Sequence, residues 1–193
     1  MFGDDELTDE QRFQRDYVIA AIDKDLFWLR DARLPFTNLT YYFGYGLDPS
    51  TYVTVPYAPL DQRLRAFIDY AQAIPGVLDQ IRTNLQTPMP RTFIDFGVAG
   101  FNGFADFYRN DVPTVCADVK DDALQAELKQ ATEPAAQAMA EMGQWLESQR
   151  AQATDAFAIG PERFTGMLRM TEGVTTPLDK LGPEAATITA DEL

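Results

Sequence analysis

Apolar side chains recur at helical spacing along most of the chain, beginning close to residue 1. Thr8 is followed three residues later by Gln11, the arrangement of a capping box, so a helix is predicted to begin there. Large apolar residues then follow at intervals of three and four, which predicts one apolar helix face extending to about Ala32. These residues are Val18, Ile22, Leu26 and Leu29.

Two helices are predicted between residues 59 and 108. Pro59 favours a helix start, and Pro75 is expected to interrupt that helix and leave a second, short piece reaching Leu85. The next helix is expected from about Pro90 to Tyr108, although its three glycines each cost about 1 kcal/mol relative to alanine. The spacing of Gly97, Gly100 and Gly103 favours close helix packing over a phosphate loop or a membrane dimer motif, because no strand precedes it and Asp95 and Asp106 flank it.

The longest helical pattern covers residues 118 to 152. Pro134 lies inside it and is expected to kink or split the helix. Gly160 and Pro161 then predict the start of a last helix, which ends near Gly173. The residues predicted to face the core of the long helix are Leu124, Leu128, Met139, Met142 and Leu146.

No alternation typical of strands occurs, so we predict an all-α fold, an irregular multi-helix bundle with a proline-interrupted long helix. Residues 1–174 are expected to form one helical domain. Residues 175–193 are expected to form a poorly structured tail or the end of a truncated chain, because they contain few large apolar side chains.

Residues 36 to 57 combine many aromatic side chains with helix-breaking Gly44, Gly46 and Pro49, which predicts short turns and loops. Tyrosine has a flat apolar ring and a hydrogen-bonding hydroxyl, so this segment is the candidate for ligand contact. Core packing under an irregular loop explains the same residues and stays open as an alternative. The candidate contact residues are Tyr41, Tyr42, Tyr45, Tyr52 and Tyr57.

The net charge and the composition exclude several kinds of partner and of catalytic site. A net charge of −14 argues against nucleic-acid and anionic-membrane partners, since such binding requires clustered Lys and Arg. The absence of histidine excludes His general bases, Ser–His and Cys–His nucleophiles and HExxH zinc sites. Cys116 has no cysteine partner and is predicted to be a small buried residue. No cofactor, catalytic residue or metal ligand is assigned.

The acidic residues suggest two other kinds of site, a calcium loop and a catalytic carboxylate pair, and the sequence supports each only weakly. Asp118, Asp121 and Asp122 lack the mid-loop Gly and terminal Glu of a calcium loop and are expected to be acidic residues of a first helical turn. A glycosidase-type carboxylate pair, Glu141 with Glu147 or Glu133 with Glu162, stays open as a distant possibility because the sequence does not set their separation.

Four segments resemble one large bacterial family, domain-of-unknown-function family 885. They are Asp16–Asp23 (DYVIAAID), Tyr57–Arg65 (YAPLDQRLR), Ala73–Leu78 (AIPGVL) and Phe157–Phe164 (FAIGPERF). The resemblance covers about residues 8 to 181. It implies a mostly helical, often exported protein whose C-terminal half carries an HExxH zinc-metallopeptidase helix. No position here matches that motif, so no zinc ligand or catalytic glutamate is transferred.

Two functional hypotheses follow, one from the resemblance and one from the residues alone. The first is a non-catalytic helical lobe that forms one wall of a substrate cleft in a metallopeptidase-like protein, with the missing remainder of that larger chain as its partner. The second is a stand-alone acidic helical module that binds a protein or peptide through the aromatic segment of residues 36 to 57. A lobe of this kind is expected to self-associate or expose an apolar patch around Tyr41, Tyr42 and Tyr45 or around Phe164 and Met167. The chain as written is expected to be soluble and cytoplasmic, or exported if its natural N-terminus is missing.

Overall fold

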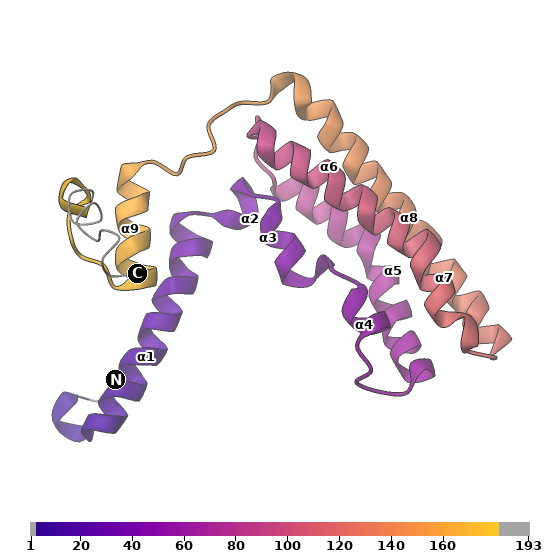
Figure 1. The fold of residues 1–193 in the computed structure, drawn as a ribbon, viewed down its shortest axis with the longest axis horizontal. Helices are drawn as coiled ribbons and strands as arrows, with labels where there is room; N and C mark the ends of the chain where they lie inside the picture. The colour runs from indigo at the N-terminus through magenta and orange to yellow at the C-terminus, as the bar shows by residue number, and fades with distance from the viewer. Residues whose placement is uncertain (1–2, 182–193) are drawn as a thin grey trace, which may run out of the picture. The chain divides into compact units, whose positions relative to one another are not determined.

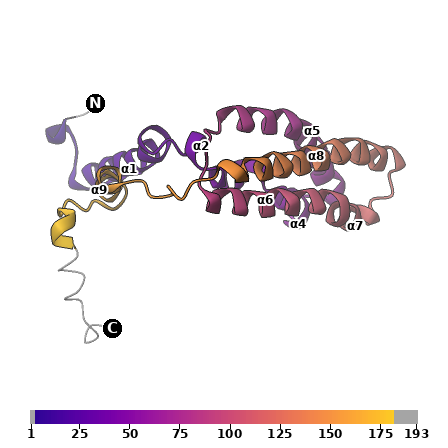
Figure 2. The same cartoon turned by 90° about the horizontal axis from the view of Figure 1, so that it is seen from above.

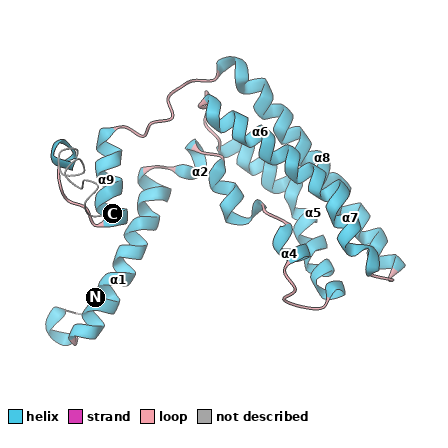
Figure 3. Ribbon diagram, in the orientation of Figure 1, coloured by secondary structure: helices cyan, strands magenta, loops and turns pink. Residues whose placement is uncertain are grey.

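The computed structural model describes residues 3–181 of the chain. Within this range the regular elements are all helical (Figures 1 and 3). β pairing among the described residues is limited to one isolated parallel bridge between Pro90 and Thr154. The predicted all-α fold is therefore confirmed. The chain divides into two compact units, the first drawn from Met1–Arg33 and Ala158–Leu193 and the second from Leu34–Phe157.

The first unit pairs a helix from the beginning of the chain with one from near its end. The capping box at Thr8 is formed as predicted: its hydroxyl accepts from the Gln11 amide, and the Gln11 side chain accepts from the Thr8 amide. At the other end, Gly173 adopts a left-handed conformation, φ 67°, that stops the last helix as expected. The elements are η1 (Asp4–Glu6), α1 (Asp9–Leu26), the π-helical turn η2 (Phe27–Asp31) and α9 (Pro161–Glu172).

The apolar face predicted for α1 is formed but not covered. No residue of α1 is buried, and Val18, Ile22 and Leu26 are between 38% and 54% exposed. α9 contacts both α1 and η2, and the buried residue at this contact is Phe27 of η2, which lies against Gly166. The predicted apolar spacing is therefore present in α1, and its large side chains remain largely exposed in this structure.

The second unit is built around three long helices. α8 (Asp122–Gln149) packs along both α5 (Leu60–Asn84) and α6 (Arg91–Asp106), as Figure 2 shows. The residues predicted to face the core from the long helix are all buried, which confirms that helix's orientation. The shorter elements are α2 (Leu34–Thr37), α3 (Thr40–Tyr42), η3 (Phe43–Leu47), α4 (Ser50–Thr54), η4 (Phe107–Asp111), α7 (Val112–Val115), η5 (Cys116–Asp118) and η6 (Arg150–Gln152).

Proline does not divide the long helices. α5 continues through Pro75, because Ala71, Ile74 and Leu78 on either side of it are buried and hold both halves in one helix. α8 likewise continues through Pro134, whose side chain lies on the exposed side. The predicted interruption at Pro75 and the predicted split at Pro134 are therefore wrong: packing of the apolar face outweighs the lost backbone hydrogen bond.

The two ends of the second unit are tied to the connection between α5 and α6. The Gln86 amide donates to the Phe36 carbonyl over 2.9 Å, and the Thr154 amide donates to the Met89 carbonyl over 3.0 Å. The Arg91 amide in turn donates to the Thr154 carbonyl over 2.8 Å. As predicted, residues 36 to 57 form short helices and turns. Of the expected C-terminal tail, residues 178–181 are helical and residues 182–193 lie outside the described residues.

Candidate functional site

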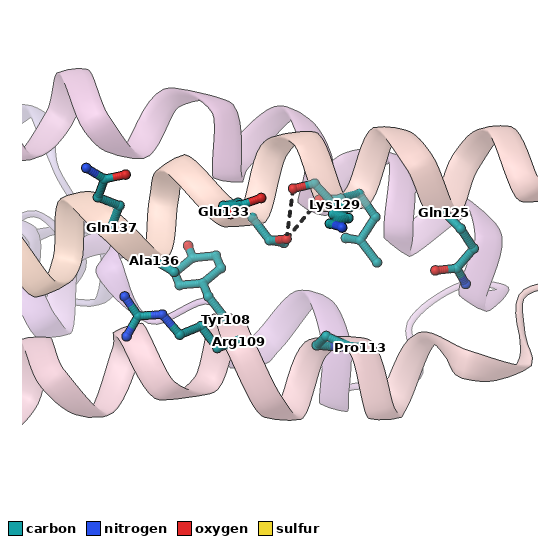
Figure 4. A pocket seen from close by; sticks show the side chains of 10 residues that line it. Tyr108, Arg109, Pro113, Gln125, Lys129, Glu133, Ala136 and Gln137 are labelled. Carbon is teal, nitrogen blue, oxygen red and sulfur yellow. Dashed lines mark hydrogen bonds between the residues drawn. The ribbon is translucent and has the colours of Figure 1, made fainter.

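A groove with a volume of about 680 Å³ runs beside α8 in the second unit (Figure 4). One side comes from η4 and α7, and the other from the first half of α8. We call it the α8 groove and define it by its lining residues. They are Tyr108, Arg109, Pro113, Gln125, Leu128, Lys129, Thr132, Glu133, Ala136 and Gln137.

Side-chain hydrogen bonds at the start of α8 hold one end of the groove in place. The Asp121 side chain accepts a hydrogen bond from the Leu124 amide over 3.0 Å and so caps α8. Gln125 then donates its Nε2 hydrogens to the carbonyls of Cys116 and Val119, over 2.7 and 3.0 Å. These bonds hold the turn between α7 and α8, and with it the spacing of the two sides of the groove.

Tyr108 lies at the base of the α8 groove and is 1% exposed. Its ring stacks on Phe67, with the ring centres 5.7 Å apart and an angle of 25° between the planes. Its hydroxyl is buried without a hydrogen-bond partner of suitable geometry among the described residues. Burial, followed by the nearby Tyr70 hydroxyl, raises the pKa of Tyr108 well above its usual value. The hydroxyl is therefore a neutral phenol at any physiological pH.

The rim of the groove is polar and the interior apolar. Arg109, Lys129 and Glu133 are exposed, whereas Leu128 and Ala136 are buried. Thr132 donates its hydroxyl to the Leu128 carbonyl over 2.9 Å, so this polar group is paired within α8. An apolar base with a few convergent polar groups is typical of a binding site. The described residues contain no group of three His, Cys, Asp or Glu side chains placed to hold a metal ion.

Three of the sequence-predicted tyrosines lie together, and they lie outside the α8 groove. Tyr41 contacts Tyr42 edge-on at 5.3 Å and stacks on Tyr45 at 4.5 Å. The Tyr42 hydroxyl donates to the Pro35 carbonyl over 2.6 Å and accepts from Asn84 over 3.2 Å. Tyr45 is 71% exposed. Most of the polar capacity of Tyr42 is thus used within the fold, and the exposed ring of Tyr45 is the part left for a ligand.

The two other predicted tyrosines are placed differently. Tyr52 lies 5.0 Å from the Tyr70 ring and 6.3 Å from the Phe67 ring, centre to centre, in the aromatic packing that supports Tyr108. Tyr57 is 55% exposed. The structure therefore does not gather the five tyrosines into one surface, and ligand contact by any of them stays a prediction.

A comparison with protein families adds to this geometry. The sequence model of the family described as "Bacterial protein of unknown function (DUF885)" matches residues 1–186. The chain belongs to the DUF885 family. No curated protein and no solved structure matches it. The family resemblance recognised in the sequence is thus confirmed, and the family's description carries no activity.

Other candidate residues of the DUF885 chain are held in place by the fold. Cys116 is buried as predicted, and burial raises the pKa of its thiol. Asp122 lies in the first turn of α8 as expected and Asp121 caps that helix, whereas Asp118 lies before α8, in η5. Glu147 forms an ion pair with Arg150, which holds the pKa of the Glu147 carboxyl below its usual value. Glu141 accepts a hydrogen bond from Gln137 over 2.8 Å.

The three glycines of α6 differ from one another. A Cβ atom at Gly97 would lie 2.8 Å from the Leu146 side chain of α8, so the predicted close helix approach occurs there. At Gly100 it would lie 2.7 Å from the Phe43 ring, and at Gly103 it would meet open space. The packing role therefore belongs to Gly97 and Gly100 and not to Gly103.

The α8 groove was not found by sequence reasoning about this DUF885 chain. A usable signal existed: Gln125, Lys129 and Glu133 recur every four residues beside the buried Leu128, which places a polar edge along an apolar face. The opposite side of the groove is formed by a π-helical turn, η4, and its position does not follow from any helical period.

Proposed function

We propose that this DUF885 chain is a non-catalytic helical lobe that holds a peptide segment in the α8 groove, as one wall of a substrate cleft in a metallopeptidase-like protein. The observation that carries the proposal is the groove itself, an apolar base under a polar, mixed-charge rim. A volume of about 680 Å³ is in the range of small-ligand sites and suits a few amino-acid residues.

The chemistry of the groove favours a peptide over a small charged ligand. Leu128 and Ala136 offer apolar contact at the base, while Arg109 and Lys129 offer donors at opposite sides of the rim. A segment that alternates an apolar and an acidic residue satisfies both. The absence of histidine from the sequence supports a binding role over the hydrolytic chemistry attributed to the family.

The test is peptide binding followed by backbone NMR of the full 193-residue chain. The probe is an acetylated, amidated peptide of alternating Leu and Glu, with a Leu and Lys peptide of equal length as the comparison. We expect the acidic peptide to shift the amide signals of residues 108–113 and 125–137. Arg109→Glu combined with Lys129→Glu is expected to weaken binding at least tenfold, whereas Arg163→Glu, an exposed arginine of the first unit, leaves it unchanged.

Two results would overturn the proposal. One is the absence of any signal shift up to millimolar peptide. The other is equal binding of the acidic and basic peptides, because it would show that the rim charges play no part. The stand-alone module hypothesis places its binding surface elsewhere, in the aromatic segment of residues 36 to 57: it is favoured if a partner shifts the amide signals of that segment and leaves those of the α8 groove unchanged.

A further inference from the structure

A second groove lies in the first unit, between η2 and one face of α9. Its volume is about 720 Å³, which is in the range of small-ligand sites. Six of its lining residues belong to α9 and fall within less than half of the helix circumference at about 100° per residue, so they form one continuous face. We call it the α9 groove. Its lining residues are Arg30, Asp31, Glu162, Arg163, Thr165, Gly166, Arg169 and Met170.

Two arginines of the α9 groove have no carboxylate partner. Arg163 and Arg169 are exposed, and their side chains form no ion pair or hydrogen bond with another described residue. Other arginines do have such partners, and Arg12, Arg15 and Arg150 each pair with an aspartate. In a chain with 30 acidic and 16 basic side chains, carboxylates are not scarce. The donors of two guanidinium groups are therefore available to a ligand in this groove.

Arg30 adds a third guanidinium from η2, on the other side of the groove. Its Nε and Nη2 donate to the Asp31 carboxylate over 2.8 and 3.1 Å, so Nη1 keeps its donors and the Asp31 charge is neutralised. Thr165 donates its hydroxyl to the Pro161 carbonyl over 2.8 Å, within α9. Glu162 is the lining carboxylate that opposes an anion. With three arginines against two carboxylates, the α9 groove is locally positive on a chain whose net charge is −14.

We propose that the α9 groove binds an anionic ligand that carries two or three linked phosphate groups. A guanidinium donates two parallel hydrogen bonds to a phosphate, which makes arginine the preferred residue for such recognition. Each phosphate has up to two negative charges and three acceptor oxygens, so linked phosphates supply enough charge to outweigh Glu162 and enough acceptors for three guanidinium groups. Arg163 and Arg169 lie six residues apart, about 9 Å along the helix axis, a separation that suits linked phosphates better than a single one.

The experiment is isothermal titration calorimetry of the full 193-residue chain with sodium tripolyphosphate at pH 8, where phosphate groups are ionised. The comparison ligand is tricarballylate, which has three carboxylates and no phosphate. We expect tripolyphosphate to bind with a Kd below about 1 mM and tricarballylate to bind about tenfold more weakly. Backbone NMR locates the binding, and tripolyphosphate should shift the amide signals of residues 30, 31 and 162–170.

Substitutions test the role of each charge. Arg163→Gln and Arg169→Gln are each expected to raise the Kd for tripolyphosphate about tenfold, because each removes charged hydrogen-bond donors. Glu162→Gln should lower this Kd about threefold, since it removes the opposing carboxylate. Arg91→Gln is the matched control and should leave the Kd unchanged: Arg91 is exposed, lies at the start of α6 in the second unit, and its side chain also has no described partner. Circular dichroism verifies the helix content of each variant.

Four results would overturn the proposal. They are the absence of heat and of amide shifts up to about 10 mM tripolyphosphate, equal binding of tricarballylate, an equal loss of affinity in Arg91→Gln and Arg163→Gln, and amide shifts that lie outside the α9 groove. Peptide binding in the α8 groove is followed through the amides of residues 108–113 and 125–137 in the other unit. The two proposals can therefore fail independently.

Discussion

The Arg63 guanidinium donates from Nη1 to the Val53 carbonyl over 2.6 Å. Arg63 is 9% exposed, and it also donates to the carbonyls of Tyr52 and Ala58, over 3.2 and 3.0 Å. A nearly buried charge is thus held by three backbone oxygens in place of a carboxylate. These bonds fasten the end of α4 and the loop after it to the first turns of α5.

Replacing Arg63 with methionine is expected to destabilise the chain by about 2–4 kcal/mol, because three carbonyls lose charged donors and become partly unsatisfied. Urea unfolding followed by circular dichroism measures the change. Arg65→Met is the control: Arg65 is mostly exposed and is 3.6 Å from Asp121, so its loss should cost about 0.5 kcal/mol or less. Equal losses for the two variants would contradict the structural role given to Arg63.

Substitutions of two α6 glycines should change the free energy of unfolding in opposite directions. Gly100→Ala is expected to destabilise by about 1–3 kcal/mol, since its Cβ would lie 2.7 Å from the Phe43 ring, and Gly100→Leu should cost more. Gly103→Ala is expected to stabilise by up to about 1 kcal/mol through helix propensity, because nothing lies near its Cβ. Thermal unfolding of the variants tests this, and a Gly100→Leu protein that melts at or above the parent temperature would show that the contact with Phe43 is absent.

Alkaline pH should lower the stability of the folded chain through two tyrosines, the buried Tyr108 and the half-buried Tyr70. Burial raises the pKa of Tyr108 and Tyr70 in the folded chain above the value of about 10 that tyrosine has when unfolded. The unfolded chain therefore releases these protons first, and folded stability is retained below pH 10 and falls as pH rises above it. Chemical unfolding at pH 8 and pH 11 measures the fall, which should be smaller for Tyr108→Phe; an identical fall in the variant would contradict the burial of this hydroxyl.

At neutral pH, Tyr108→Phe is expected to be neutral or stabilising by up to about 1 kcal/mol, since it removes a buried hydroxyl that has no partner of suitable geometry. Tyr70→Phe is the comparison, because it loses a 3.0 Å hydrogen bond from the Tyr70 hydroxyl to the Gly46 carbonyl and should be destabilised by about 1 kcal/mol. Urea unfolding at pH 7 ranks the two. A Tyr108→Phe protein less stable than Tyr70→Phe would show that the Tyr108 hydroxyl has a partner after all.

The purified chain is expected to carry no stoichiometric transition metal, since the sequence contains no histidine and one cysteine. Elemental analysis after dialysis measures the content. About one zinc per chain, retained against a mild chelator, would contradict the prediction and would call for a site built from carboxylates alone.

Sequence reasoning succeeded where a local signal decides the outcome. The capping box at Thr8 and the stop at Gly173 depend on a few neighbouring residues, and both helix ends lie where they were expected. It failed at Pro75, because a local cost of a few kcal/mol was outweighed by burial of the side chains before and after it. Local propensity and tertiary packing act there in opposite directions, and only the structure shows which is larger.

The candidate site was less predictable than the fold. The cluster of tyrosines in the sequence predicted ligand contact. In the structure Tyr41, Tyr42 and Tyr52 pack against other aromatic rings of the chain, and the Tyr42 hydroxyl donates to a backbone carbonyl. The α8 groove joins residues from two elements whose separation is set by the Gln125 hydrogen bonds to the preceding turn. Such a spacing is a property of the tertiary structure, so no pattern within either element reveals it.

The division of the chain into units has a consequence for the order of its folding. The second unit is inserted in the sequence between α1 and α9. During synthesis it is therefore completed before α9, and α1 has no α9 to pair with until then. Once the second unit is folded, its two ends are held close together, because the Phe36 carbonyl and the Thr154 amide both form hydrogen bonds with the connection between α5 and α6. Bringing α1 and α9 together then closes a short effective loop at low entropic cost, so prior folding of the second unit favours the pairing of α1 with α9.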